Sequence, residues 1–213
     1  MRGRPRPYQS GSTHALDDDQ VRRLLAVVST KADTGSITAK RDYALLLLFF
    51  LTGLRRNEVM RLKWRDVEIN GSVVLLRTLK LKGGDYRSRE VRHRAVRDAL
   101  IEYLTASGRL DGMTPEAPLW TRHDRAGAPG GPMTSHAFAL NLKRYAAEAG
   151  IARIHLHQTR HTFARMVSED MGSLLEVQDA LGHRSASTTR VYVQRVAVKR
   201  DRHSEGIGKR LGV

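Results

Sequence analysis

Four residues in the last third of the chain have the types and spacing that chemistry at a phosphate group requires. His157 and Arg160 are three residues apart, so they would share one face of a helix. Tyr192 follows nine residues after His183. Arginine binds phosphate oxygens through a charged planar fork, histidine exchanges protons near neutral pH, and a tyrosine hydroxyl can become a nucleophile. Together these residues could build a phosphate site with a nucleophile beside it.

Short consecutive helices are expected to position this group. Ser173 with Glu176 three residues later is typical of a capping box, which would start a helix after the one that carries the His-x-x-Arg pair. Gly182 suits the end of that helix, and His183 would lie just past it. A third helix would then carry Tyr192.

A second block of polar residues lies about a hundred positions earlier. Residues 52–58 read TGLRRNE and residues 62–66 read LKWRD. Arg55 alone would usually be a surface charge, and Glu58 three residues later could pair with it and orient it. Whether Arg55 belongs to a functional site depends on the motifs elsewhere in the chain.

Taken together, the two blocks resemble the tyrosine recombinases, also called phage-type integrases. That family has an early arginine box, then H-x-x-R, then L-G-H, then a tyrosine on a following helix. Here these are residues 52–58, residues 157–160, residues 181–183 and Tyr192, in the same order. One departure is Thr159, where the family more often has leucine.

The resemblance implies a site-specific DNA recombinase or integrase that needs no cofactor, metal or ATP. Tyr192 would form a 3′-phosphotyrosyl bond and the 5′-hydroxyl would leave. The two arginines would bind the non-bridging oxygens of the phosphate. One histidine would accept a proton and the other would donate a hydrogen bond to the phosphate, and the sequence does not decide which histidine has which role. The implied catalytic residues are Arg55, Lys82, His157, Arg160, His183 and Tyr192.

Lys82 enters this set because the family uses a lysine on a β-hairpin as the general acid for the leaving oxygen. Lys82 lies at the turn between two expected strands, and residues 89–91 (REV) resemble the family's return strand. Lys80 is only two residues away and remains the alternative.

The periodicity of the chain predicts a mainly helical α+β fold with a small antiparallel sheet of two or three strands, as in the catalytic domain of the family. Asp17 with Gln20 predicts a helix start, and residues 44–51 are apolar on every side, which predicts a central helix. The other expected helices cover residues 57–64, 96–104 and 134–149; the strands cover 66–69, 72–79 and 87–94; a long surface loop covers 107–133.

The charge balance favours a polyanionic partner. The chain has 37 Lys and Arg against 22 Asp and Glu, a formal charge of +15. Such an excess attracts double-stranded DNA without regard to sequence. There are no cysteines, and the longest apolar run is too short to span a bilayer. We therefore expect a cytoplasmic, nucleoid-associated protein that does not bind membranes.

The expected organisation is a basic flexible arm over residues 1–16 and a catalytic domain over residues 17–213. The family's N-terminal core-binding domain is expected to be absent. The tail, about residues 193–213, would pack on a neighbouring protomer. The resemblance implies a homotetramer on two DNA sites, monomeric or weakly associated without DNA.

Three alternatives compete with this interpretation. His157 and His161 stand at i and i+4 as in helical zinc sites, but no glutamate base lies between them and Arg160 would repel a cation, which disfavours a metal-dependent nuclease. A type IB topoisomerase-like enzyme would use the same chemistry without pairing two sites. A catalytically idle DNA-binding protein would have no need of Tyr192 or Lys82.

Overall fold

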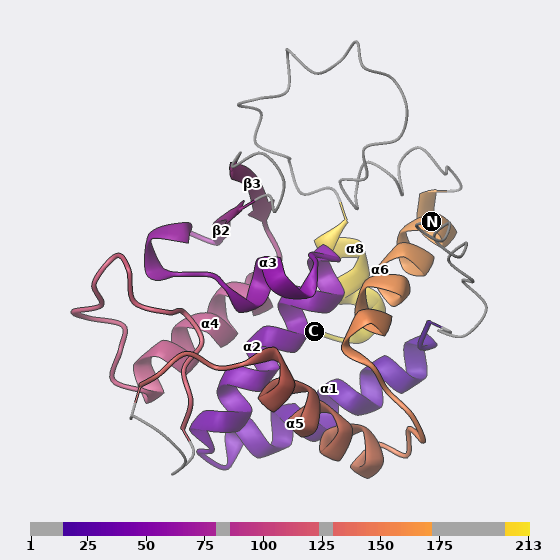
Figure 1. Cartoon of the computed structure of the whole chain (residues 1–213). Coiled ribbons are helices and arrows are strands. Elements are labelled where there is room, and N and C mark those ends of the chain that lie inside the picture. Colours follow the sequence, from indigo (N-terminus) through magenta and orange to yellow (C-terminus); the bar gives the residue numbers. More distant parts are fainter. Residues whose placement is uncertain (1–14, 80–85, 124–129, 172–202) are drawn as a thin grey trace, which may run out of the picture.

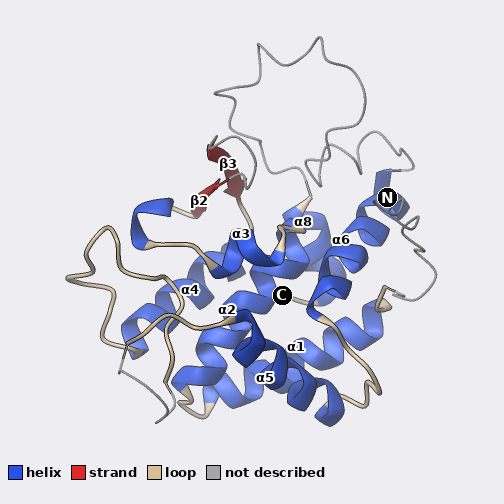
Figure 2. Cartoon of the chain, in the orientation of Figure 1, coloured by secondary structure: helices blue, strands red, loops and turns tan. Residues whose placement is uncertain are grey.

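The computed structural model describes residues 15–79, 86–123, 130–171 and 203–213 (Figure 1). Helices make up most of these residues, and one small sheet lies at one end (Figure 2). This confirms the expected mainly helical α+β class. The helices are α1 (Asp18–Asp33), α2 (Ile37–Thr52), α3 (Arg56–Met60), α4 (Arg94–Ala106), α5 (Ser135–Glu148), α6 (Leu156–Met171) and α8 (Ser204–Leu211), with a 3₁₀ turn η2 (Trp64–Asp66) and strands β1 (Val67–Asn70), β2 (Val73–Leu79) and β3 (Tyr86–Val91).

Helix α2 is the centre of the core. Every residue from Ala44 to Thr52 is buried, and α1, α4, α6 and α8 all pack against this helix. Because no face of such a segment tolerates water, it is stable only when surrounded by other elements. The prediction from its composition is confirmed.

Helix α1 begins at the expected capping box. The amide of Gln20 donates to Asp17 Oδ1 at 2.7 Å, and the amide of Asp17 donates to Gln20 Oε1 at 3.1 Å. These two bonds satisfy amides that have no partner inside the helix. Thr134 caps α5 in the same way, through a 3.1 Å bond from the amide of Ala137 to Thr134 Oγ1.

Helix α3 is shorter than predicted. Helical spacing suggested a helix from Asn57 to Trp64, but α3 ends at Met60. The following residues pair with a distant segment instead: the carbonyl of Leu62 accepts from the amide of Leu119 at 2.8 Å, and the amide of Trp64 donates to the carbonyl of Ala117 at 2.9 Å. These long-range bonds outweigh a local helical pattern.

The expected surface loop over residues 107–133 is partly internal, which corrects that prediction. Leu119, Trp120 and Met133 are buried in the core. The indole Nε1 of Trp120 donates to the carbonyl of Val59 at 2.8 Å. The part of this segment around Trp120 therefore packs against α3, although the segment contains many glycines and prolines.

The sheet has three antiparallel strands in the order β1-β2-β3. The return strand β3 ends at Val91 rather than Arg94, because His93 caps α4: its Nδ1 accepts from the amide of Ala95 at 3.3 Å. The hairpin turn that contains Lys82 lies outside the described residues.

Helix α8 packs on α1 and α2 of its own chain, with Ile207 and Leu211 buried. The predicted packing of the tail on a neighbouring protomer stays a prediction. Within the described residues, no helix is long and apolar enough to cross a membrane.

Candidate active site

Three of the six predicted catalytic residues fall within the described part of the chain. They are Arg55, His157 and Arg160, and the structure brings all three to the junction of α2, α3 and α6. Lys82, His183 and Tyr192 lie outside the described residues.

Arg160 is anchored where α6 crosses the end of α2. The residue is 7% exposed, and its Nη1 donates a hydrogen bond to the carbonyl of Gly53. This bond ties the two catalytic blocks together across more than a hundred residues of sequence.

Only glycine fits at position 53, for two independent reasons. Its backbone is left-handed, with φ +59°, which ends α2. A Cβ there would also overlap the ring of Phe163, a residue of α6. Gly53 therefore both turns the chain toward Arg55 and lets α6 approach closely enough for Arg160 to reach that turn.

Arg55 stands at the start of α3 and is held by Glu58, as the sequence suggested. Glu58 Oε2 accepts from the amide of Arg55 at 2.7 Å, and Glu58 Oε1 accepts from Arg55 Nη1 at 3.1 Å. The glutamate side chain is 10% exposed, whereas the Arg55 side chain is 45% exposed. Arg55 is thus oriented on one side and open to a ligand on the other.

The site carries an excess of positive charge. Burial, together with the charges of Arg55, Arg89 and Arg87, lowers the pKa of Arg160 to about 10, and the charge of Glu58 acts in the opposite direction. The guanidinium still carries its charge at neutral pH. Such a cluster is stabilised when an anion enters it.

His157 is poised to be neutral at pH 7. Burial lowers the pKa of His157, and electrostatic interactions with His161, Arg160 and Arg56 act in the same direction. A neutral imidazole can accept a proton. The rings of His157 and His161 meet edge to face with centroids 4.7 Å apart.

The departure at position 159 is accommodated within α6. The Thr159 hydroxyl donates to the carbonyl of Leu156 at 2.8 Å, so its polarity is satisfied by the helix backbone.

In the described residues, no group of three or more His, Cys, Asp or Glu side chains could hold a metal ion, and His155, His157 and His161 do not form one.

A cavity of about 420 Å³ lies at the other end of α2. Lys31, Arg41, Arg144 and Tyr145 are among its lining residues, and none of the predicted catalytic residues contributes to it. We assign it no part in the chemistry.

Two residues that the sequence did not single out act on the site. Arg87 and Arg89 are on β3, and their charges bear on Arg160. Their spacing of two residues on a strand indicates that they share one face of the sheet. Which face that is depends on the register of β3 on β2, which the sequence does not give.

The fold and the arginine pair define a tyrosine recombinase catalytic domain. The sequence model described as the phage integrase family matches residues 14–197, and the chain belongs to that family. Among curated relatives, "Tyrosine recombinase XerC" of Xanthomonas campestris pv. campestris (strain B100) is 35% identical over 178 residues, which cover 83% of this chain and 50% of the relative. "Tyrosine recombinase XerA" of Thermococcus kodakarensis is 30% identical over 185 residues, covering 84% of this chain and 57% of the relative.

Solved structures show the same fold. The XerH site-specific recombinase in its post-cleavage complex with palindromic difH substrate aligns with a TM-score of 0.66 at 24% identity, covering 84% of this chain and 49% of that one. The lambda integrase catalytic core aligns with a TM-score of 0.55 at 18% identity, covering 80% of this chain and 95% of that one. The chain spans about half the length of the curated relatives it matches.

Proposed function

We propose that this chain is the catalytic part of a site-specific DNA recombinase, which breaks and rejoins DNA through Tyr192. The observation that carries the proposal is the meeting of Arg55 and Arg160 at Gly53, in a chain of the phage integrase family. Two guanidiniums at one junction suit a phosphodiester better than any neutral substrate.

The reaction begins when the scissile phosphate binds between Arg55 and Arg160. His157 takes the phenol proton of Tyr192 directly or through His183. The tyrosine oxygen then bonds to phosphorus as the bond from phosphorus to the 5′-oxygen breaks. The leaving oxygen takes a proton from Lys82, or from Lys80 in its place. Tyr192, His183 and the lysine are assigned from their sequence motifs alone.

The arginines supply charge stabilisation, which is usually the largest catalytic contribution. They compensate the charge that develops on the non-bridging oxygens. Because the phosphotyrosyl bond conserves the energy of the broken linkage, a second 5′-hydroxyl can reverse or redirect the step. No metal and no ATP enter this scheme.

We further propose double-stranded DNA as the partner, four copies acting on two sites, and a cytoplasmic location with the nucleoid. The charge of +15 supports the first point. Among the similar structures, XerH is bound to difH substrate and a lambda integrase dimer is bound to a core site. Those complexes belong to the neighbours, and we extend the DNA partner to this chain by family membership.

The test uses pooled nicked duplexes that let the 5′ fragment diffuse away and trap a covalent adduct. Wild type and Tyr192→Phe are incubated with them in EDTA and run on denaturing gels, alone and fused behind the core-binding part of a XerC relative. We expect an adduct with wild type that is lost in Tyr192→Phe. An adduct that persists in the variant, or that requires added metal, would overturn the mechanism.

A second readout separates recombination from relaxation. Paired sites recovered from the adduct assay are placed on one supercoiled plasmid. Recombinant product supports the proposal, whereas relaxation without recombinant product indicates a topoisomerase-like activity.

A further inference from the structure

Strand β3 presents two arginines on the face of the sheet that also forms the core. Directly opposed residues of an antiparallel pair share a face. Arg89 lies opposite Leu76 and Arg87 lies opposite Thr78, and both of these β2 partners are buried. Val91, two residues after Arg89, is fully buried on the same face. Toward the hairpin tip, this face therefore changes from apolar side chains to half-buried arginines.

The same face borders the catalytic arginines. β2 packs on α3, the helix that begins beside Arg55, and the sheet lies next to α3 in Figure 1. The charges of Arg87 and Arg89 reach Arg160 strongly enough to shift its titration. The charges of four guanidiniums thus act at one junction, and the charge of Glu58 offsets part of them.

This is more positive charge than one phosphodiester can neutralise. A phosphodiester carries a single negative charge, which matches the net formal charge of Arg55, Arg160 and Glu58. The two arginines of β3 add two formal positive charges to this. Duplex DNA, however, carries a phosphate at every step of each strand, about 3.4 Å apart along the axis. A phosphate next to the scissile one is the anion that would accompany it into the junction.

We propose that Arg87 and Arg89 form a second phosphate subsite, which binds the phosphodiester adjacent to the one that is cleaved. This rests on the proposed function, because it assumes that DNA enters at Arg55 and Arg160. The subsite fixes which phosphate of the strand occupies the catalytic site. Arg87 and Arg89 are positioning residues and take no part in proton transfer.

The opposite face of the hairpin offers a matched control. Arg77 lies opposite Ser88, so its side chain leaves the other side of the sheet, and its Nη2 contacts Glu68 Oε2 at 2.9 Å. Arg77 belongs to the same hairpin, carries the same charge and is adjacent in sequence to the strand positions opposite Arg87 and Arg89. It differs in the face of the sheet from which its side chain leaves and in its ion pair with Glu68.

The first test measures binding of a 30-base-pair duplex over a series of salt concentrations, with Tyr192→Phe in every protein to prevent trapping. Losing one phosphate contact reduces the slope of log affinity against log salt by about 0.9. We expect Arg87→Gln and Arg89→Gln each to reduce it by about that amount, Arg89→Lys to keep most of it, and Arg77→Gln to change it little. Equal effects of Arg77→Gln and Arg89→Gln would overturn the subsite.

The second test locates the phosphate. In the nicked duplex that gives the adduct, the phosphate on one side of the scissile one is replaced by a neutral methylphosphonate, then the phosphate on the other side. One replacement should slow adduct formation by wild type and have no further effect in Arg87→Gln/Arg89→Gln. An equal slowing in both proteins at both positions contradicts the proposal. If no duplex gives an adduct, the proposed function fails, while the salt slopes still decide whether these arginines bind phosphate.

Discussion

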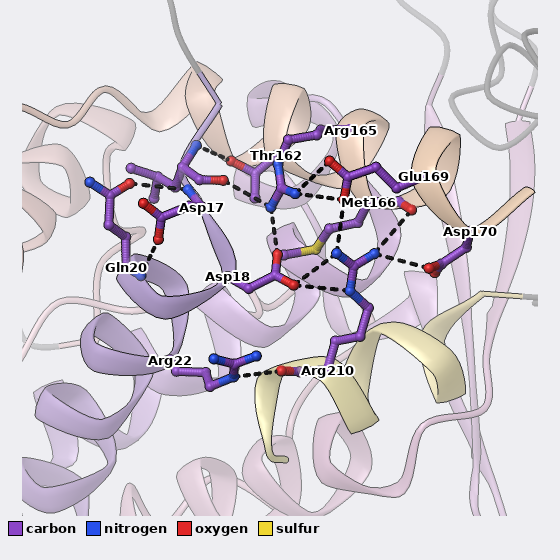
Figure 3. A network of polar contacts seen from close by, with 11 residues as sticks. Asp17, Asp18, Gln20, Arg22, Thr162, Arg165, Met166, Glu169, Asp170 and Arg210 are labelled. Carbon is purple, nitrogen blue, oxygen red and sulfur yellow. Dashed lines mark hydrogen bonds and ion pairs between the residues drawn. The ribbon is translucent and has the colours of Figure 1, made fainter. Parts of the chain in front are cut away.

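Within the described residues, α6 contributes to two arginine clusters that are built in opposite ways. At the junction of α1, α6 and α8, Arg165 and Arg210 meet three carboxylates (Figure 3). At the junction of α2, α3 and α6, Arg55 and Arg160 meet the carboxylate of Glu58 and the charges of two further arginines. Carboxylates balance the first cluster, whereas cations dominate the second, which suits it to an anionic ligand.

The Arg210 cluster joins three elements that are distant in sequence. Arg210 Nη2 contacts Asp18 Oδ2 and Glu169 Oε2, both at 2.8 Å, and Arg210 Nη1 contacts Asp170 Oδ1 at 2.9 Å. Arg165 contacts Asp18 Oδ1 at 2.6 Å. Glu169 and Asp170 lie in the last turn of α6, and Arg210 lies in α8.

The titration of the two clusters reflects this difference. Hydrogen bonds to Glu169, and further contacts with Asp18, raise the pKa of Arg210 above its usual value despite partial burial. Burial and neighbouring cations lower the pKa of Arg160 to about 10. The fold therefore stabilises the charge of Arg210 and is destabilised by the charge of Arg160. Arg160 keeps its charge at neutral pH all the same, which suits it to bind an anion.

The largest expected effect separates Arg160 from Arg165, two arginines of α6 that belong to different clusters. Arg160→Gln should lower the rate of adduct formation about a hundredfold or more, because it removes a charged donor from the phosphate. Its thermal midpoint should change less than that of Arg165→Gln, because relief of a buried charge among other cations offsets the lost bond to the carbonyl of Gly53. Arg165→Gln, five residues along the same helix, should lower the thermal midpoint but keep the rate per folded molecule. Loss of the rate in Arg165→Gln at a temperature where it is folded would make the two clusters one functional unit.

The second prediction concerns the turn that assembles the Arg160 cluster. Gly53→Ala should destabilise the chain by about 2–4 kcal/mol, from the left-handed backbone and from overpacking against Phe163. Gly35 is also left-handed, with φ +92°, but a Cβ at that position would have nothing within 4 Å, so Gly35→Ala should cost only about 1–2 kcal/mol. Urea unfolding measures both. Equal losses would mean that α6 does not need its close approach to α2.

Much of what builds these two clusters could be read from local sequence. The capping box of Asp17 and Gln20 spans four residues, and the run from Ala44 to Leu51 has no polar face, so neither depends on distant contacts. The catalytic arginine box and the His-x-x-Arg pair were recognised by the order of their motifs. Gly53 follows the apolar run directly and ends α2.

What could not be read depends on contacts between distant residues. The second reason for Gly53 is Phe163, 110 positions later in the chain. The early end of α3 results from pairing with residues 117–119. The cluster around Arg210 joins residues 18, 165, 169 and 170, and no periodicity in the sequence connects them. The register of β3 on β2 decides which face of the sheet Arg87 and Arg89 share.

The third prediction tests how closely α8 must approach for the Arg210 cluster to form. A Cβ at Gly208 would overlap the imidazole of His93, the residue that caps α4. Gly208→Ala should therefore lower the free energy of unfolding by about 1–3 kcal/mol. Gly206→Ala, two residues earlier on the same helix with nothing within 4 Å, should instead raise it by about 0.5–1 kcal/mol. If urea unfolding shows both variants to be stabilised, α8 can shift on α4 without cost.

The smallest effect expected is the dependence of the Arg210 cluster on acid. Hydrogen bonds from Arg210 and Arg165 lower the pKa of Glu169. Burial alone would raise the pKa of Asp18, but bonds from Arg165 and Arg210 outweigh it and lower that pKa. Carboxylates with a depressed folded-state pKa stabilise the fold above their unfolded values, near 3.8 for Asp and 4.5 for Glu, and this stabilisation is lost as the pH falls through the folded-state values. The side chains are partly exposed, so the contribution at pH 7 should be about 1 kcal/mol.

Arg210→Gln isolates that contribution. Urea unfolding should show the variant to be less stable than wild type at pH 7, and the difference should shrink as the pH falls below about 4, because the carboxylates become neutral in both proteins. Lys209→Gln, the adjacent residue of α8, should show no such dependence. If the difference in stability between Arg210→Gln and wild type is unchanged in acid, the Arg210 side chain holds α8 through its bond to the carbonyl of Met166 and through packing. Apolar residues such as Ile207 would then stabilise the packing of α8. The two clusters would then differ in how deeply their arginines are buried, and ion pairing would not distinguish them.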